Sequence, residues 1–370
     1  MRVVPPGIRR MRSRQMTNTS AAFADFASNL KFAAIPAPVV ERAKLLIADS
    51  IGIAIRAYHD VPSSAVHLRA LRSMGQLGDF PIFGSRGRLS APAATELNGA
   101  LIHSLDFDDT YSPGALHPSA AVLPAALAAV QMSGASGADL LAAVVAGYEL
   151  MCRLSVALGA ADHYDRGFHP SATCGAFAAA MAAGRALGLD AHQCESALGI
   201  ALSQTAGSLQ FLVNGAWTKR FQVGNAARAG LVSACLAREG YRGAAEPLEG
   251  KHGFLQAYAS NAQTHEATRE LGETWRTLEI AVKPYPSCRF SHAAIDAIVG
   301  LKSDYAFAPK DISRIVCGLS RKGILLVGDP IEHKRRPADV VSAQFSMPFA
   351  AAVAVMEDGM GWDSYSRWLG

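Results

Sequence analysis

The sequence has few charged residues, no paired-cysteine pattern and no recognisable cofactor-binding motif. Only 18% of its 370 residues are charged and half are hydrophobic. This composition excludes an intrinsically disordered chain and favours a large apolar core. The formal net charge of +4 is too small to indicate a nucleic-acid-binding protein. The length suits two domains, or one large domain with a smaller lobe.

The cysteines give no sign of a disulfide framework or a metal site. Among six cysteines, no two are spaced as C-x-x-C, and none lies in a zinc-like Cys/His pattern. We therefore expect reduced, buried thiols in a cytoplasmic protein. No run of 18 or more apolar residues is free of polar breaks, so we also expect a soluble protein that does not enter a membrane.

Three common catalytic and nucleotide-binding motifs are absent from the sequence. There is no G-x-G-x-x-G after a strand and no G-x-x-x-x-G-K-[ST], which argues against dinucleotides and nucleoside triphosphates. The lack of G-x-S-x-G disfavours an α/β-hydrolase. We expect any chemistry to use the chain's own side chains, with no metal and no organic cofactor.

The first residues are rich in arginine. Five arginines lie within residues 1–14, and a second methionine, Met16, follows. The segment lacks the apolar run of a secretory signal. We interpret residues 1–15 as a disordered tail or an unused upstream start, and a transit peptide is the less favoured alternative.

Apolar residues at helical spacing dominate residues 18–260, and short β-prone runs appear only later. The predicted helices are 39–57, 91–105, 118–132, 137–158, 170–187, 191–203, 223–239, 291–301 and 340–356, and the predicted strands are 278–282 and 312–319. We therefore predict a mainly α fold. It consists of a large helical domain (16–270) and a smaller α+β domain (271–370).

One short motif occurs twice at predicted helix starts. His117 and His169 each begin the sequence His-Pro-Ser-Ala, and proline is favoured in the first helical turn. A helix N-terminus attracts anions and disfavours an imidazolium, so a histidine there tends to stay neutral and able to act as a base. The alternative is that each histidine only caps its helix. The presence of two copies favours a functional role.

Two further segments combine cations with helix starts. Lys283 and Arg289 lie in a proline-rich segment just before His292 and its helix, and Lys219 precedes the helix at 223–239. Arginine presents a fork that suits carboxylates, and a cation at a helix start suggests an anionic partner. Solvated surface charge is the alternative for each of these residues.

Three carboxylates lie close together before the first His-Pro-Ser-Ala. Asp106, Asp108 and Asp109 are followed by Thr110, and so many like charges are unfavourable unless they are paired or solvated. The glycine and closing glutamate of a calcium loop are missing. The apolar flanks favour a buried polar site over a solvated loop.

At these residues the chain resembles the MmgE/PrpD family, which includes 2-methylcitrate dehydratase, cis-aconitate decarboxylase and iminodisuccinate epimerase. The matching stretches are NGALIHSLDFDDTYSPGALHPSAAVLPAALA, FHPSATCGAFAAAMAAGRALGLD, TKRFQVGNAARAG, KPYPSCRFSHAAIDA and ADVVSAQFSMPFAAAVA. The resemblance covers about residues 18–360. It implies a helical domain, a smaller lid domain, a homodimer and an active site between the domains. That site would be lined by Asp106, Thr110, His117, His169, Lys219 and His292.

The sequence departs from the family pattern in two places. Family members continue beyond the position of Gly370 and return to the helical domain, so we expect this return to be missing. The loop at 112–116 also lacks the tryptophan-containing insert of dedicated 2-methylcitrate dehydratases, which weakens that assignment.

These features predict a cofactor-independent lyase or isomerase that moves a proton beside a carboxylate of a small di- or tricarboxylate. A hydro-lyase like 2-methylcitrate dehydratase is the leading expectation, and decarboxylation and epimerisation remain open.

We assign acid–base roles to His117 and His169 and an orienting role to Asp106. Lys219 and Arg289 would hold carboxylates. His292 is a further catalytic candidate, and Thr110 and Lys283 are candidates for substrate binding. The alternative is a non-catalytic carboxylate-binding or scaffold protein.

Overall fold

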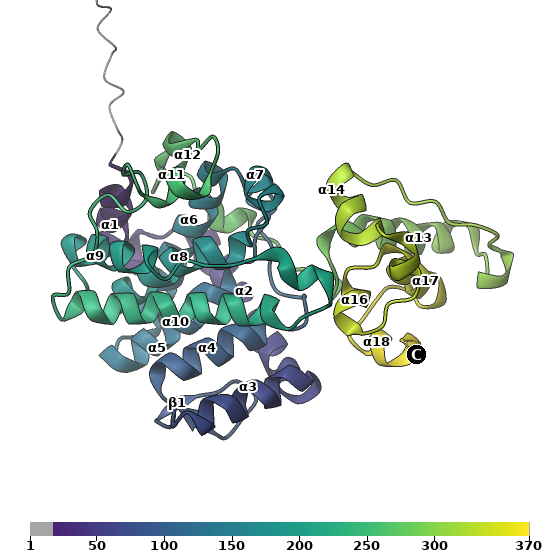
Figure 1. Ribbon diagram of the computed structural model, residues 1–370, viewed down its shortest axis with the longest axis horizontal. Coiled ribbons are helices and arrows are strands. Elements are labelled where there is room, and N and C mark those ends of the chain that lie inside the picture. The colour runs from purple at the N-terminus through teal and green to yellow at the C-terminus, as the bar shows by residue number, and fades with distance from the viewer. Residues whose placement is uncertain (1–17, 370) are drawn as a thin grey trace, which may run out of the picture.

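The computed structural model describes residues 18–369 and consists almost wholly of helices. Figure 1 shows a larger helical body formed by α1 to α12, beside a smaller group formed by α13 to α18. The mainly α fold predicted from the sequence is confirmed. The predicted tail at residues 1–15 lies outside the described residues.

The larger body contains nine helices of 11 residues or more, three short ones and one small hairpin. The helices are α1 (Thr19–Asn29), α2 (Ala37–Asp60), α3 (Pro62–Ser73), α4 (Ala91–Ile102), α5 (Ser119–Ser133), α6 (Gly137–Leu158), α7 (Ala160–Asp165), α8 (Pro170–Ala186), α9 (Ala191–Leu202), α10 (Thr218–Arg238), α11 (Phe254–Tyr258) and α12 (Thr264–Thr268), and the hairpin pairs β1 (Phe80–Pro81) with β2 (Arg88–Leu89).

Small residues let the central helices α4, α5, α8 and α10 approach one another closely. A Cβ atom built on Gly224 would lie 2.2 Å from the carbonyl oxygen of Glu96 in α4. One built on Gly230 would lie 2.3 Å from the Cβ of Ala179 in α8. Almost all of α8 is buried. The alanine and glycine content of the sequence therefore sets the helix spacing in the body.

Helix α6 packs against α8 and is largely buried. It is the one helix in the described part of the chain that is long and apolar enough to cross a membrane, but 83% of its apolar window is buried inside the protein. It carries a buried ion pair, in which Nε of Arg153 lies 3.1 Å from Oε2 of Glu149, and this pair faces the segment after α12. Glu149 accepts hydrogen bonds from the backbone N–H and hydroxyl of Thr277, both at 2.8 Å. Core packing explains the apolar character of this helix.

The smaller group has its own apolar core. Its helices are α13 (His292–Tyr305), α14 (Arg321–Gly323), α15 (Ile331–Arg335), α16 (Val340–Gln344), α17 (Met347–Met356) and α18 (Asp363–Trp368). Helix α17 packs on α13. The largest apolar cluster of the chain runs from Phe23 to Ile280, whereas this one runs from Ile295 to Tyr365. A domain division near residue 270 remains our proposal.

The two strands predicted after residue 270 are not formed. Within residues 271–369 the structure assigns no strand, so the α+β character expected there is absent. Residues 312–319 have no partner strand in the described part of the chain, and Val316 is 76% exposed. Residues 278–282 form a helical turn and one isolated bridge, from Ala281 to Thr110. β-Branched residues favour extended backbone, but a strand also needs a partner for its hydrogen bonds.

Most predicted helices differ from the observed ones by a few residues at their ends, and two differ more. Helix α10 begins at Thr218, five residues before the predicted start, so Lys219 lies in its first turn. The predicted helix 340–356 is divided into α16 and α17. The division is at Ser346, whose hydroxyl accepts a hydrogen bond from the N–H of Phe349 and so caps α17. A helix cap of this kind satisfies a free N–H group and starts a new helix.

Candidate active site

The loop between α4 and α5 carries the aspartates predicted from the sequence. It leaves α4 at His103 and enters α5 at Ser119. Thr110 in this loop pairs with Ala281 through two backbone hydrogen bonds of 2.8 and 2.9 Å. This pairing fixes the segment that follows α12 against the loop. It thereby brings Lys283 to the aspartates.

Asp106 is held between two lysines. Lys219 forms an ion pair with its Oδ1, and the Nζ of Lys283 lies 3.4 Å from the same atom. Lys283 also donates to the Asp106 carbonyl oxygen at 2.7 Å. Burial alone would raise the pKa of Asp106, but the two lysines hold that pKa well below its usual range. The second carboxylate oxygen has no partner within residues 18–369 and can accept a hydrogen bond from a ligand.

Asp106 also has a left-handed backbone. Its φ is +50°, a region that non-glycine residues seldom adopt. Such local strain persists where the surroundings hold the residue in place, and it is common in functional sites. Here the contacts of Lys219 and Lys283 keep Asp106 in this conformation.

Three imidazole rings meet beside this loop. The ring centre of His103 lies 5.1 Å from that of His117 and 5.6 Å from that of His169. His117 directly precedes Pro118, the N-cap residue of α5, and His169 is the N-cap residue of α8. The two His-Pro-Ser-Ala copies therefore converge on one place, with His103 between them.

All three histidines have the same hydrogen-bonding arrangement. In each, Nδ1 faces an oxygen atom, so Nδ1 carries the proton and Nε2 keeps its lone pair. The pairs are His103 with Asp108 Oδ2 at 2.7 Å, His117 with the Asp109 carbonyl at 2.7 Å, and His169 with Gln222 Oε1 at 3.0 Å. The Gln222 amide is oriented by its own donation to the Ser208 carbonyl. Three Nε2 atoms are thus left without a hydrogen-bond partner within the described range, 18–369.

Burial keeps these histidines neutral. It lowers the pKa of His117 to about 3, although the Asp108 charge opposes the shift. For His103 and His169 the pKa falls well below the ordinary value, mainly through burial and in part because Lys219 is near. A neutral imidazole with a free Nε2 is a proton acceptor.

The other two aspartates have structural contacts. Asp109 accepts hydrogen bonds from the Ser119 N–H at 3.1 Å and from its hydroxyl at 2.6 Å, and so caps α5. Burial raises the pKa of Asp109 to about 8, and it also raises the pKa of Asp108. The three clustered carboxylates therefore differ in role: Asp106 is an ionised partner of lysines, Asp108 orients His103, and Asp109 caps a helix.

His292 and Arg289 form a separate pair. Arg289 donates to Nδ1 of His292 at 2.9 Å, and Nε2 of His292 donates to the Ser287 carbonyl at 3.1 Å. Both ring nitrogens are therefore occupied. Burial and then Lys283 lower the pKa of His292 to about 4.

Thr110, a predicted substrate-binding residue, lies beside the three histidines. Its hydroxyl is 3.4 Å from Nδ1 of His117.

A cavity of about 640 Å³ lies between the larger body and the smaller group. Phe211, in its wall, contacts the His169 ring with centres 5.5 Å apart, and the Phe345 ring lies 5.4 Å from the Nζ of Lys219. The wall of the cavity also contains Lys334 and Arg336. The cavity therefore adjoins the histidine and lysine cluster and offers cations to an anionic ligand.

Sequence reasoning missed two residues of this cluster, His103 and Gln222, and gave Asp108 no role of its own. His103, Asp108 and Gln222 hold or complete the histidine arrangement. Two spacings could have indicated them. His103 ends a helix five residues before Asp108, and Gln222 lies one helical turn after Lys219, on the same face of α10.

Comparison with known proteins gives relatives over most of the chain. A cis-aconitate decarboxylase-like protein, oryM, of Aspergillus oryzae is 33% identical over 358 residues, covering 92% of this chain and 73% of its own. The cis-aconitate decarboxylase of Aspergillus terreus is 31% identical over 363 residues, covering 93% and 73%. The human cis-aconitate decarboxylase is 29% identical over 367 residues, covering 95% and 73%.

Family profiles match both parts of the chain. The profile of the MmgE/PrpD N-terminal domain matches residues 21–267, and that of the MmgE/PrpD C-terminal domain matches residues 285–367. Both matches agree with the resemblance seen in the sequence motifs. The chain belongs to the MmgE/PrpD family.

Proposed function

We propose that this protein is a lyase that removes CO2 from a small unsaturated tricarboxylate, with cis-aconitate as the first candidate. The observation that carries the proposal is the cluster of three histidines beside a carboxylate held by two lysines. The decarboxylase names of the relatives support it. The intact set of polar residues argues against a non-catalytic binding protein.

Substrate binding would depend on the cations around the cavity. Lys219 and Lys283 lie at the histidine cluster, and Lys334 and Arg336 line the approach. Fixed cations in a site with little water bind carboxylates and stabilise negative charge as it develops. His292 would position Arg289 for the same purpose, because both of its ring nitrogens are occupied.

The chemistry needs one bond cleavage and one proton delivery. The bond to the departing carboxylate breaks, its electron pair stays on the remaining carbon skeleton, and CO2 leaves. The added negative charge of a bound tricarboxylate raises the pKa of nearby histidines, so His117 or His169 can take up a proton from water. That imidazolium then protonates the carbon and returns to its neutral state. No cofactor enters this scheme, and we expect turnover to survive EDTA.

Dehydration of a hydroxy-tricarboxylate such as 2-methylcitrate is the second candidate. One observation favours it: burial leaves His103, His117 and His169 neutral. Neutral histidines are ready to remove a proton, which dehydration requires and decarboxylation does not. The curated relatives compared above are decarboxylases, so we place dehydration second.

The test is product analysis by NMR in deuterated buffer. The protein would be incubated separately with cis-aconitate, 2-methylcitrate and iminodisuccinate. We expect loss of CO2 from cis-aconitate and one deuterium on the protonated carbon of the dicarboxylate product. An unsaturated product from 2-methylcitrate without CO2 loss would support the second candidate instead. Failure to convert any of the three would contradict the proposed function.

A further inference from the structure

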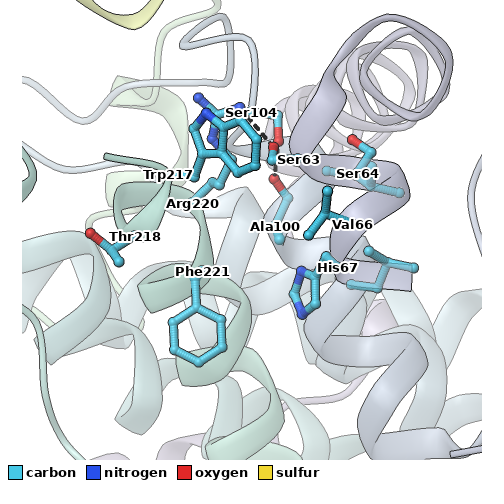
Figure 2. Close-up of a pocket in the computed structure, with 12 residues that line it drawn as sticks. Ser63, Ser64, Val66, His67, Ala100, Ser104, Trp217, Thr218, Arg220 and Phe221 are labelled. Atoms are coloured by element: carbon cyan, nitrogen blue, oxygen red, sulfur yellow. Dashed lines mark hydrogen bonds between the residues drawn. The ribbon is translucent and has the colours of Figure 1, made fainter. Parts of the chain in front are cut away.

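A second cavity, of about 240 Å³, lies between α3, α4 and the start of α10. Figure 2 shows Arg220, Ser63 and Ser104 at one end of it and Phe221 with His67 at the other. Most of the remaining wall is apolar and includes Val66, Leu97 and Trp217. The cavity thus combines a polar end with an apolar one.

Arg220 is a buried cation with few hydrogen-bond partners. It is only 7% exposed. It donates one hydrogen bond, from Nη1 to the Ser63 hydroxyl at 3.1 Å, and its Nε has no partner within residues 18–369. Burial lowers the pKa of Arg220 to about 10 although the charges of Asp106 and Asp339 oppose the shift, so Arg220 stays charged at neutral pH. A buried guanidinium has five donors and is normally paired with an anion.

Two carboxylates act on Arg220 by their charge, but Asp106 is paired with Lys219 and Asp339 caps α16, and within residues 18–369 neither forms an ion pair with Arg220. The Ser64 hydroxyl donates to the Ala57 carbonyl, and the Ser104 hydroxyl donates to the Ala100 carbonyl. Glu96 is engaged by His67 at 2.7 Å. The described residues therefore leave room for an external carboxylate at the Arg220 end.

We propose that this cavity binds a short-chain carboxylic acid, with its carboxylate at Arg220 and its apolar tail between Trp217 and Phe221. The size of the cavity sets the length of the tail. A volume of 240 Å³ equals the liquid volume of about eight water molecules, and so fits about eight heavy atoms. Hexanoate, with six carbons and two oxygens, has that size.

The bound acid would lie behind the candidate active site. Arg220 follows Lys219 in the first turn of α10, and Ser104 follows His103 at the end of α4. Lys219 pairs with Asp106 on the other side. Occupation of the cavity would therefore affect the two segments that place the lysine and the central histidine. The inference does not depend on which reaction the site catalyses.

Fluorescence provides the readout, because Trp217 lines the cavity and is 46% exposed. Hexanoate would be titrated into the protein while tryptophan emission is followed, and hexanamide would serve as the uncharged ligand of the same length. We expect a saturable change with hexanoate and at least about tenfold weaker binding of hexanamide, since charge-assisted hydrogen bonds are the stronger ones. Trp217→Phe should remove the emission change while calorimetry still detects binding.

Variants assign the binding to Arg220. Arg220→Gln should weaken hexanoate binding about tenfold or more, whereas Arg238→Gln, at the exposed end of the same helix, should leave it unchanged. Ser63→Ala is a milder variant that removes the hydrogen-bond partner of Arg220, should Arg220→Gln fail to fold. Three results would each overturn the proposal. Hexanamide could bind as tightly as hexanoate, both cavity variants could bind hexanoate as the wild type does, or cis-aconitate could displace hexanoate in one-to-one competition. The absence of binding to the folded protein would overturn it as well.

Discussion

His169 is the residue whose replacement best separates a proton-transfer role from a structural one. Its Nδ1 is bonded to Gln222 and its Nε2 is free. His169→Gln should keep the fold and leave substrate KM nearly unchanged but lower kcat about a hundredfold or more, because general acid–base catalysis contributes that much. Steady-state kinetics on a confirmed substrate, with circular dichroism to check folding, measures both.

His265→Gln is the matched control for that variant. His265 lies in α12 with a side chain 64% exposed, and it should behave as the wild type. Near-normal turnover of His169→Gln would show that the acid–base assignment is wrong, and His117 would then be the better candidate.

Asp109 gives the protein a pH-dependent stability. Its folded pKa is about 8, against an ordinary value of 3.8. Between these values the native state binds more protons than the unfolded state, so the free energy of unfolding falls as pH rises and the loss is complete above about pH 8. From pH 6.5 to 8, where histidines are already neutral in the unfolded chain, we expect a decrease of roughly 1.4 kcal/mol per pH unit from this group.

Chemical denaturation at several pH values tests that expectation. Asp109→Asn resembles the protonated acid and can still bond to Ser119, so its stability should change little over the same range. Asp139→Asn, in an exposed capping box, should keep the slope of the wild type. An equal slope in Asp109→Asn would show that another group is responsible.

The sequence predicted the site residues that have a local signature. His117 and His169 were indicated by the proline that follows each and by the helix start that this proline favours. His103 was missed because its position depends on rings brought together from α4, α5 and α8. The occupied nitrogens of His292 could not be predicted either, since they depend on a side-chain contact with Arg289 and on the backbone of Ser287.

At the scale of elements, the close contact between α4 and α10 requires glycine. A Cβ on Gly224 would meet the Glu96 carbonyl at 2.2 Å and the Ala100 nitrogen at 2.9 Å, and backbone atoms cannot move aside easily. Gly224→Ala should therefore lower the free energy of unfolding by at least 1–3 kcal/mol, the usual cost of overpacking, estimated to order of magnitude. Thermal and chemical denaturation measure this change.

Gly300→Ala is the control for the same chemical change in an open position. Gly300 lies inside α13, and nothing stands within 4 Å of the added methyl group. It should stabilise the protein by roughly 0.5–1 kcal/mol, because alanine favours helix over glycine. A neutral or stabilising Gly224→Ala would contradict the packing argument.

Long helices were predictable because their apolar spacing and their end signals agree. Gly188 and Gly240 follow α8 and α10 with φ of +72° and +87°, as expected for residues that stop helices. The strand predicted at 312–319 was wrong because a single run of β-branched residues cannot show whether a partner strand exists. The early start of α10 was missed because Trp217, before its first turn, makes no side-chain cap that the sequence could signal.

At the scale of the whole molecule, Asp106 links the larger body to the segment that leads to the smaller group. Lys219 holds it from α10 and Lys283 from beyond residue 280, while Gln344 of α16 donates to the neighbouring Leu105 carbonyl at 2.7 Å. Asp106→Asn removes the charge from between two buried cations. We expect amide hydrogen exchange at 281–289 and 340–346 to become about tenfold faster or more, because breaking a buried pair is costly.

An ion pair at the surface between the two parts gives the control. Arg56 of α2 pairs with Asp363 of α18 at the surface, where the Asp363 side chain is 64% exposed. Asp363→Asn should barely change the exchange rates, since exposed ion pairs contribute little. Equal effects of the two variants would show that Asp106 does not hold the parts together.

We also predict that the protein forms a homodimer through its larger body. The family resemblance implies it, and large apolar side chains are exposed there, including Leu45 at 61% in α2, and Met74 and Leu77 at 63% and 68% after α3. An interface would remove this apolar surface from water. Light scattering at micromolar concentration should give twice the mass of one chain, and a monomer under these conditions would contradict the prediction.

The alanine and glycine packing of the body has a consequence for calorimetry. Small side chains bring backbones together but bury less apolar surface per residue than leucine or phenylalanine would. The heat capacity increase on unfolding follows the apolar surface exposed and is offset by the polar backbone surface exposed with it. Its value per residue should therefore fall below the roughly 12–15 cal/mol/K typical of globular proteins. The stability of this protein should accordingly vary slowly with temperature, with a broad maximum and weak cold sensitivity.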